Sequence, residues 1–143
     1  MGLTLGQAMY GHLSGTTAVT ALTSNRIYPL IAPQGASLPF VVYQQISNPG
    51  IHAMISDPAI RSPRFQVASF AETYSGVRAV AEQVKSALQD YRTAVDGLFG
   101  DNTSGVDVQR VFFENEIDLS DIDPDTMAAT YHIVQDYIIW ATT

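Results

Sequence analysis

The sequence contains no cysteine, and this absence removes several kinds of chemistry at once. A chain without thiols cannot form disulfides, thiolate zinc sites or a cysteine nucleophile, which fits assembly in a reducing compartment. Histidine is also scarce, with three residues at positions 12, 52 and 132 and no HxxH or HExxH spacing among them. We therefore expect no catalytic residues, no metal site and no cofactor that depends on these groups.

Basic residues are few, and their distribution is uneven. Seven Lys and Arg residues stand against 14 Asp and Glu residues, which gives a net charge of −7. Residues 1–92 hold six basic and four acidic residues, whereas residues 93–143 hold one and ten. Proteins that bind nucleic acid through its phosphates need clustered Lys and Arg. The sequence therefore predicts no specific binding of nucleic acid, although DNA could still pass nearby.

Long apolar runs are absent as well. No stretch approaches the roughly 20 apolar residues that cross a bilayer, and residues 1–13 lack a basic segment followed by an apolar run. We expect a soluble, cytosolic chain without a membrane partner. The 143 residues suit one domain, residues 1–143. A hydrophobic content of 46% with only 15% charged residues further suggests apolar surface reserved for a partner.

Periodicity predicts the order of helices and strands. Apolar residues spaced four apart predict a helix over residues 5–13 that Thr4 caps, and a long apolar stripe predicts another over residues 73–91. A further helical turn is expected at residues 17–22 and an extended segment at 26–29. β-branched and aromatic runs predict strands over residues 40–46, 64–70, 109–119 and 130–141, with a polar turn at 120–125. The fold class that follows is α+β, a two-layer sandwich in which one long and one short helix pack on a mainly antiparallel sheet of about four strands.

Acidic residues provide the strongest local candidates for chemistry, and each candidate lacks a required partner. Residues 121–125 begin like a calcium loop, but Thr126 stands where glycine is needed and His132 where a bidentate glutamate is needed. Alternation places Glu114, Glu116 and Asp118 on one face of their strand. Three carboxylates could bind a divalent metal or act as acid and base, but no histidine accompanies them in that segment.

Two smaller features of the sequence also involve groups that could do chemistry. His132 and Asp136 share a face of the last strand and could be joined by a hydrogen bond. Serine residues stand in no GxSxG context, and the glycines near residue 11 lack the lysine of a phosphate-binding loop. The sequence therefore indicates a protein that is not an enzyme.

The N-terminal part of the chain contains three short strings in a fixed order: R-I-Y-P at residues 26–29, P-Q-G-A at 33–36 and L-P-F-V-V-Y at 38–43. In this order they resemble the tail-completion, or tail-terminator, family of long-tailed phages. The resemblance extends through R-F-Q-V at residues 64–67 and the long helix that ends near residue 88. Residues 93–143 match the family less distinctly.

This resemblance implies a structural subunit that forms a hexameric ring, terminates the tail tube and presents a surface to the head connector. Its partners would be other copies of itself, the tail tube protein and the head-tail connector or stopper. It would reside in the virion, at the head-proximal end of the tail, after assembly in the host cytoplasm. The family also has a long connection that contacts neighbours, here residues 47–61. On this basis we expect the subunit interface to include residues of this connection and the first residue of the strand that follows it. These residues are Ser47, Ile51, Met54, Ile55, Arg61 and Arg64.

Two hypotheses follow for the acidic C-terminal part. In a ring, Glu114, Glu116 and Asp118 would face the lumen and repel DNA, so that the DNA does not stick during its passage. The alternative is a monomeric acidic protein-binding module, in which the same face recruits a basic protein. The oligomeric state of the chain separates these two hypotheses.

Overall fold

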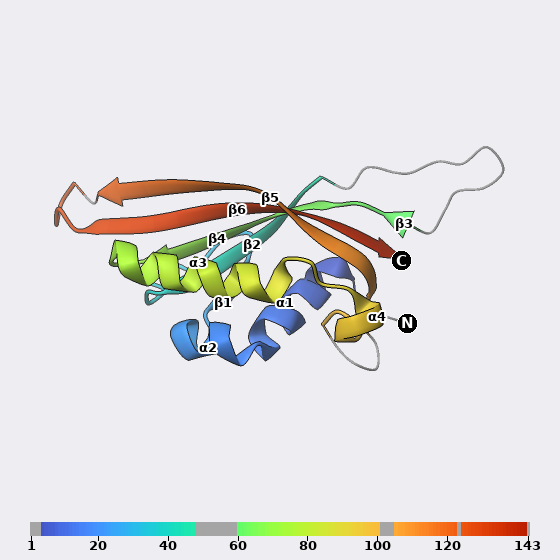
Figure 1. Cartoon of the computed structure of the whole chain (residues 1–143). Coiled ribbons are helices and arrows are strands. Elements are labelled where there is room, and N and C mark those ends of the chain that lie inside the picture. Colours follow the sequence, from blue (N-terminus) through green and yellow to red (C-terminus); the bar gives the residue numbers. More distant parts are fainter. Residues whose placement is uncertain (1–3, 48–59, 101–104, 123, 143) are drawn as a thin grey trace.

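The helices of the protein all lie on one side of its sheet, as the computed structural model shows (Figure 1). The structure describes residues 4–47, 60–100, 105–122 and 124–142. The helices in these ranges are α1 (Leu5–Gly15), α2 (Thr17–Thr23), α3 (Tyr74–Leu88) and α4 (Thr93–Asp96). The strands are β1 (Ile27–Pro29), β2 (Phe40–Ser47), β3 (Ile60–Arg61), β4 (Arg64–Ala71), β5 (Asp107–Ile122) and β6 (Ala129–Thr142).

The sheet has six strands in the described residues, which is more than the sequence predicts. They run in the order β1-β2-β4-β6, with β5 on the other side of β6 and β3 beside the C-terminal end of β6. β1 is parallel to β2 and the remaining pairs are antiparallel. The α+β class is therefore confirmed, whereas the counts of four strands and two helices are wrong. β1 and β3 are too short to show a period of two, and α4 is a single turn.

The two longest helices, α1 and α3, each begin at a threonine that caps the helix. The hydroxyl of Thr4 accepts from the backbone N–H of Gln7 at 3.2 Å, while the Gln7 side chain accepts from the N–H of Thr4 at 2.9 Å. This reciprocal pair satisfies two backbone donors at the start of α1. Thr73 caps α3 in the same way by accepting from the N–H of Gly76 at 3.0 Å. α3 ends at residue 88, three residues before its predicted end.

The core lies between the sheet and the helices. β4 alternates strictly, so that Phe65, Val67, Ser69 and Ala71 are buried on the side of the helices. From below the sheet, α3 packs its apolar stripe against them. That stripe consists of the buried residues Val77, Val80, Ala81, Val84 and Leu88. The predicted amphipathic helix therefore covers the sheet as expected.

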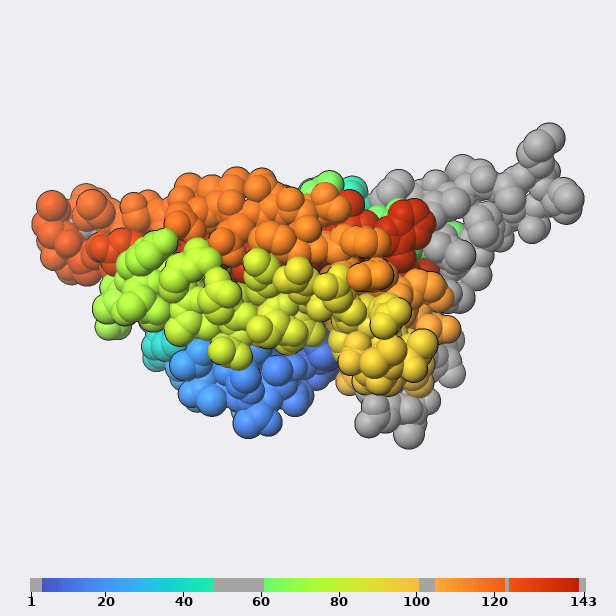
Figure 2. Space-filling view, in the orientation of Figure 1, coloured from blue at the N-terminus to red at the C-terminus, as the bar shows by residue number. Residues whose placement is uncertain are grey.

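The β5–β6 hairpin is longer than its sequence pattern predicts. β5 continues through residues expected to form a turn, and its pairing with β6 shifts register between Val108 and Arg110 and again between Phe113 and Asn115. Such a bulge leaves one residue without a partner and moves the following side chains to the opposite face. Figure 2 shows β5 running along one side of the molecule, with α3 beneath it and α1 and α2 below α3.

Candidate functional site

The face of the sheet opposite the helices is not covered by any described element (Figure 1). Register places its side chains in rows that cross β2, β4, β6 and β5 in turn. The first row is Phe40, Phe70, His132 and Leu119; the second is Val42, Ala68, Val134 and Ile117; the third is Gln44, Gln66, Asp136 and Asn115. We call this surface the open face. Two of its three rows are almost wholly apolar, which is unusual for a sheet face in contact with water.

The first row of the open face is a continuous stack of rings. The ring centroids of Phe40 and Phe70 lie 4.8 Å apart, and those of Phe70 and His132 also lie 4.8 Å apart, each pair close to parallel. Tyr28 of β1 extends the stack with an edge contact to Phe40 at 5.9 Å. His132 has a buried Nδ1 atom without a hydrogen-bond partner. Stacking thus fixes the rings as one rigid apolar surface.

A groove forms at the other end of the open face, where β2, β4, β5 and β6 meet. Its lining consists of Ser47, Ser62, Arg64, Phe112, Glu114, Ile138 and Trp140. The groove thus combines a large apolar floor with one cation and one carboxylate at its sides. A groove with these properties suits a protein side chain better than a small reactive substrate.

The groove brings together two of the residues that the sequence predicts as interface. Ser47 ends β2 and Arg64 begins β4, and both line the groove. The Arg64 guanidinium also lies 3.8 Å from the Asp136 carboxylate of its own chain. Arg61 lies apart from them in β3, paired with Ala141. The predicted interface residues Ile51, Met54 and Ile55 lie outside the described residues, so their role stays a prediction.

The three carboxylates predicted to share one face of β5 are divided between both faces. The register shift after Phe113 leaves Glu114 in the groove of the open face. Glu116 pairs with Gln135 and points to the side of the helices, as Asp118 does. The prediction of a single acidic strip is therefore wrong, because alternation holds only while no bulge intervenes.

Arg78 of α3 gathers the two carboxylates on the helix side. Its guanidinium lies 2.7 Å from Glu82, 3.0 Å from Glu116 and 3.4 Å from Asp118. Hydrogen bonds to Glu82 and then Glu116 raise the pKa of Arg78 above its usual value. The Tyr74 hydroxyl also donates to Asp118 at 2.9 Å. The ion pairs of Arg78 with Glu116 and Asp118 thus link α3 to β5, and they are partly exposed to solvent.

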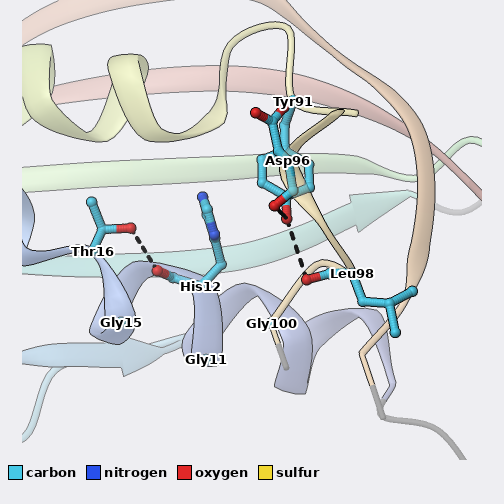
Figure 3. A pocket seen from close by; sticks show the side chains of 8 residues that line it. All are labelled: Gly11, His12, Gly15, Thr16, Tyr91, Asp96, Leu98 and Gly100. Atoms are coloured by element: carbon cyan, nitrogen blue, oxygen red, sulfur yellow. Dashed lines mark hydrogen bonds between the residues drawn. The ribbon is translucent and has the colours of Figure 1, made fainter. Parts of the chain in front are cut away.

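A pocket on the helix side is lined by His12, Thr16, Tyr91, Asp96, Leu98 and neighbouring glycines (Figure 3). His12 is held by a 2.7 Å hydrogen bond between its Nε2 atom and the carbonyl of Ala87. Its ring also contacts those of Tyr91 and Phe99, with centroids 4.9 and 4.7 Å away. The Tyr91 hydroxyl donates to the Gly97 carbonyl at 2.7 Å. His12 therefore joins α1 to α3 through its hydrogen bond and to the segment after α3 through its ring contacts.

The stability of the protein should depend on pH through His12. Burial lowers the pKa of His12 below its usual value of 6.5, since the charged imidazolium loses its hydration. The unfolded chain therefore binds more protons, and stability should be constant above about pH 6.5 and decline as the pH falls through that value. Urea unfolding at pH 7.5 and 5.5 should show this decline in the wild type and a smaller one in His12→Gln. Equal declines in both proteins would contradict the assignment.

Gly100 should be intolerant of a side chain for two reasons. It has a φ of +95°, and a Cβ atom there would lie 2.6 Å from Cα of Ala8 in α1. We expect Gly100→Ala to lower the free energy of unfolding by about 3 kcal/mol, from backbone strain together with the collision. Gly35→Ala is the matched control, because Gly35 has a φ of +80° with open space around it. It should cost only about 1 kcal/mol, from strain alone.

The remaining sequence-based candidates are not brought together. His132 and Asp136 are four residues apart on β6, about 13 Å along a strand. The prediction of a hydrogen bond between them is therefore wrong. In the part of the chain that the structure describes, no group of three or more His, Asp or Glu side chains could hold a metal ion. No described helix is both long and apolar enough to cross a bilayer.

Comparison with known proteins identifies the family. The model of the tail completion protein gp17 family matches residues 7–142, which is nearly the whole chain. The chain belongs to the tail completion protein gp17 family. Membership makes it a structural protein of phage-type tails, a virion component and not an enzyme. It also extends the resemblance of residues 5–88 into the acidic C-terminal part, which the sequence pattern had left indistinct.

A solved structure has a similar fold. It comes from the virion of a native gene transfer agent (GTA) particle and superposes with a TM-score of 0.70 at 14% sequence identity. The match covers 96% of this chain and 94% of the other. No curated protein matches the sequence. At this identity the structural likeness concerns the fold, whereas the family match carries the role in tail assembly.

The open face itself was not predicted from the sequence, although a signal was present. β2 contains Phe40, Val41, Val42 and Tyr43 without a polar residue between them, and the end of β6 is similarly continuous. A strand with one wet face should alternate, whereas a continuous apolar run indicates burial on both faces. Among the described elements, helices cover one face only, so the second face stays open.

Proposed function

We propose that the chain assembles as a ring, with six copies, at the head-proximal end of the tail, where it terminates the tail tube and joins it to the head connector. The observation that carries this proposal is the open face, a largely apolar sheet surface that no described helix or strand covers. Family membership supports a location in the tail, and the similar fold in a gene transfer agent virion supports a place within an assembled particle. The ring would form during assembly in the host cytoplasm.

The physical argument for assembly is the cost of keeping the open face in water. Phe112, Ile117, Leu119 and Trp140 are all exposed, and they belong to the same face as the stacked rings. Contiguous apolar surface of this kind on a soluble chain marks a protein interface. Tail tube protein, connector and further copies of the chain are the partners that we propose for this surface and for the edges of the sheet.

DNA would pass through the ring without specific binding. We place Glu114 along this passage, because Glu116 and Asp118 point to the helix side and are engaged by Arg78. No Lys or Arg follows Arg110 in the sequence, so phosphate binding by this part of the chain is disfavoured. A ring structure with Glu114 on the outer rim would overturn this placement.

The test is electron microscopy of tail tubes assembled with and without the protein. Tubes assembled with it should carry a ring at one end and stop growing, and tubes assembled without it should continue to polymerise. Bare tube ends at saturating protein would contradict the proposal. The same samples test the joining step, since only capped tubes should bind purified heads.

The alternative is a monomeric acidic protein-binding module. The exposed carboxylates of the hairpin favour it, whereas the engagement of Glu116 and Asp118 by Arg78 reduces the acidic surface available to a basic partner. The two functions differ in salt dependence, because charge-driven recruitment weakens at high salt while apolar assembly does not. Tube capping that survives 0.5 M salt would exclude the module.

A further inference from the structure

Exposed apolar side chains gather at two opposite edges of the molecule, outside the open face. One group lies where α1 meets β1: a groove lined by Gly6, Gln7, Tyr10, Pro29 and Tyr43, followed by the exposed Leu30 and Ile31. The N–H of Leu30 donates to the carbonyl of Tyr43 at 2.8 Å, so this segment is held beside the groove. We call this the α1–β1 surface.

The second group lies on β5 and in the turn that follows it. Ile122 and Met127 are exposed there, at 55% and 72%. We call this the hairpin tip. β1 and β5 are the two outermost strands in the order of the sheet, so the two surfaces lie at opposite edges.

The charges of the two surfaces are complementary. The first 56 residues contain no Asp or Glu, so the α1–β1 surface carries no carboxylate and has Arg26 nearby. The hairpin carries Asp121 and Asp125 near its tip, and no Lys or Arg is present after Arg110. Two hairpin tips facing each other would place like charges in contact, which is unfavourable. A hairpin tip facing an α1–β1 surface avoids this repulsion.

Neither edge is suited to adding a strand through its backbone. β1 has only three residues and ends in Pro29, which has no N–H to donate. β5 carries charged side chains along its outer edge, which discourage strand addition. Contact between these edges would therefore depend on the apolar side chains.

We infer that neighbouring copies of the chain meet head to tail, with the hairpin tip of one copy seated on the α1–β1 surface of the next. A closed ring requires two different, complementary surfaces on each subunit, and these two edges supply them. This inference rests on the proposed ring and identifies the surfaces that would close it. The open face remains free to contact the tube or the connector.

The absence of native cysteine allows a direct test by cross-linking. Ile31 is 79% exposed and Ile122 is 55% exposed, so Ile31→Cys and Ile122→Cys should leave the fold intact. After assembly on tail tubes and treatment with a short bismaleimide, the double variant should give a ladder of covalent oligomers. An equal mixture of the two single variants should stop at covalent dimers, and each single variant alone should give monomers.

Val95→Cys provides the matched control, since Val95 is 69% exposed on α4 and belongs to neither surface. A mixture of Val95→Cys and Ile31→Cys should give no dimers. Dimers from either single variant alone would indicate a symmetric contact and overturn the inference. Rings seen by microscopy without any cross-link in the mixture would also overturn it while leaving the proposed function intact. If no rings form on tubes at all, the proposed function fails and this contact fails with it.

Discussion

Phe65→Ala should lower the free energy of unfolding by about 4 kcal/mol, while Phe70→Ala should cost only about 1 kcal/mol. The two residues lie on the same strand, β4, but on opposite faces of the sheet. Phe65 is 1% exposed and belongs to the core under the helices, so its removal leaves a cavity. Phe70 is half-buried between Phe40 and His132 on the open face. Urea unfolding followed by circular dichroism measures both values.

The effects of these two changes on tube capping should follow the opposite order to their effects on stability. Phe70→Ala should leave a folded monomer that no longer caps tail tubes, because the stacked rings of the open face lose their central member. Phe65→Ala should reduce capping only in proportion to the folded fraction. Full capping by Phe70→Ala would show that the open face is not used in assembly. Val95→Ala, on the exposed side of α4, should change neither quantity.

Gln135→Leu should lower the free energy of unfolding by about 3 kcal/mol. Gln135 is fully buried, and its amide donates to the Ala81 carbonyl at 3.2 Å and to Glu116 at 2.9 Å. Its oxygen accepts from the Tyr137 hydroxyl at 3.1 Å. Leucine would leave this hydroxyl buried without its partner and would remove the second hydrogen bond to the Ala81 carbonyl. Burial and the charges of Glu116 and Glu82 also raise the pKa of Tyr137, so the phenol remains a donor.

A double-mutant cycle isolates the bond between Gln135 and Tyr137. Tyr137→Phe alone should cost about 1–2 kcal/mol, because it leaves the amide oxygen of Gln135 unpaired. The double variant with Gln135→Leu removes both partners, so its cost should be clearly less than the sum of the single costs. Additive costs would show that the two side chains do not interact in solution.

Local pattern was sufficient to predict most of the helices and strands. The cap at Thr4, the apolar stripe of α3 and the strand β4 all depend on residues close in sequence, and all are confirmed. The prediction failed where the determinant lies elsewhere in the chain. β3 exists because residues 60 and 61 meet the end of β6, and α3 ends before Tyr91 because the chain turns at Asp90, whose φ is +62°.

The candidate site was likewise predictable in its residues but not in their arrangement. The types of the residues in the groove were apparent from the sequence, and Ser47, Arg64 and Glu114 were already singled out. Their meeting in one groove was not, because it depends on the register of four strands. The division of Glu114 from Glu116 and Asp118 likewise depends on a bulge that no alternation pattern reveals.

Composition and local pattern were enough to establish the absence of thiol chemistry, the acidic C-terminal part, the order of the main elements and the resemblance to tail-completion proteins. These properties depend on residue content or on neighbours a few residues apart. Which apolar residues remain uncovered depends on the packing of the whole chain, since helices on a single side of the sheet leave Phe40, Phe70 and Trp140 outside the core. Burial is a property of the whole packing arrangement, and a strand's sequence shows that a face is apolar without showing what covers it.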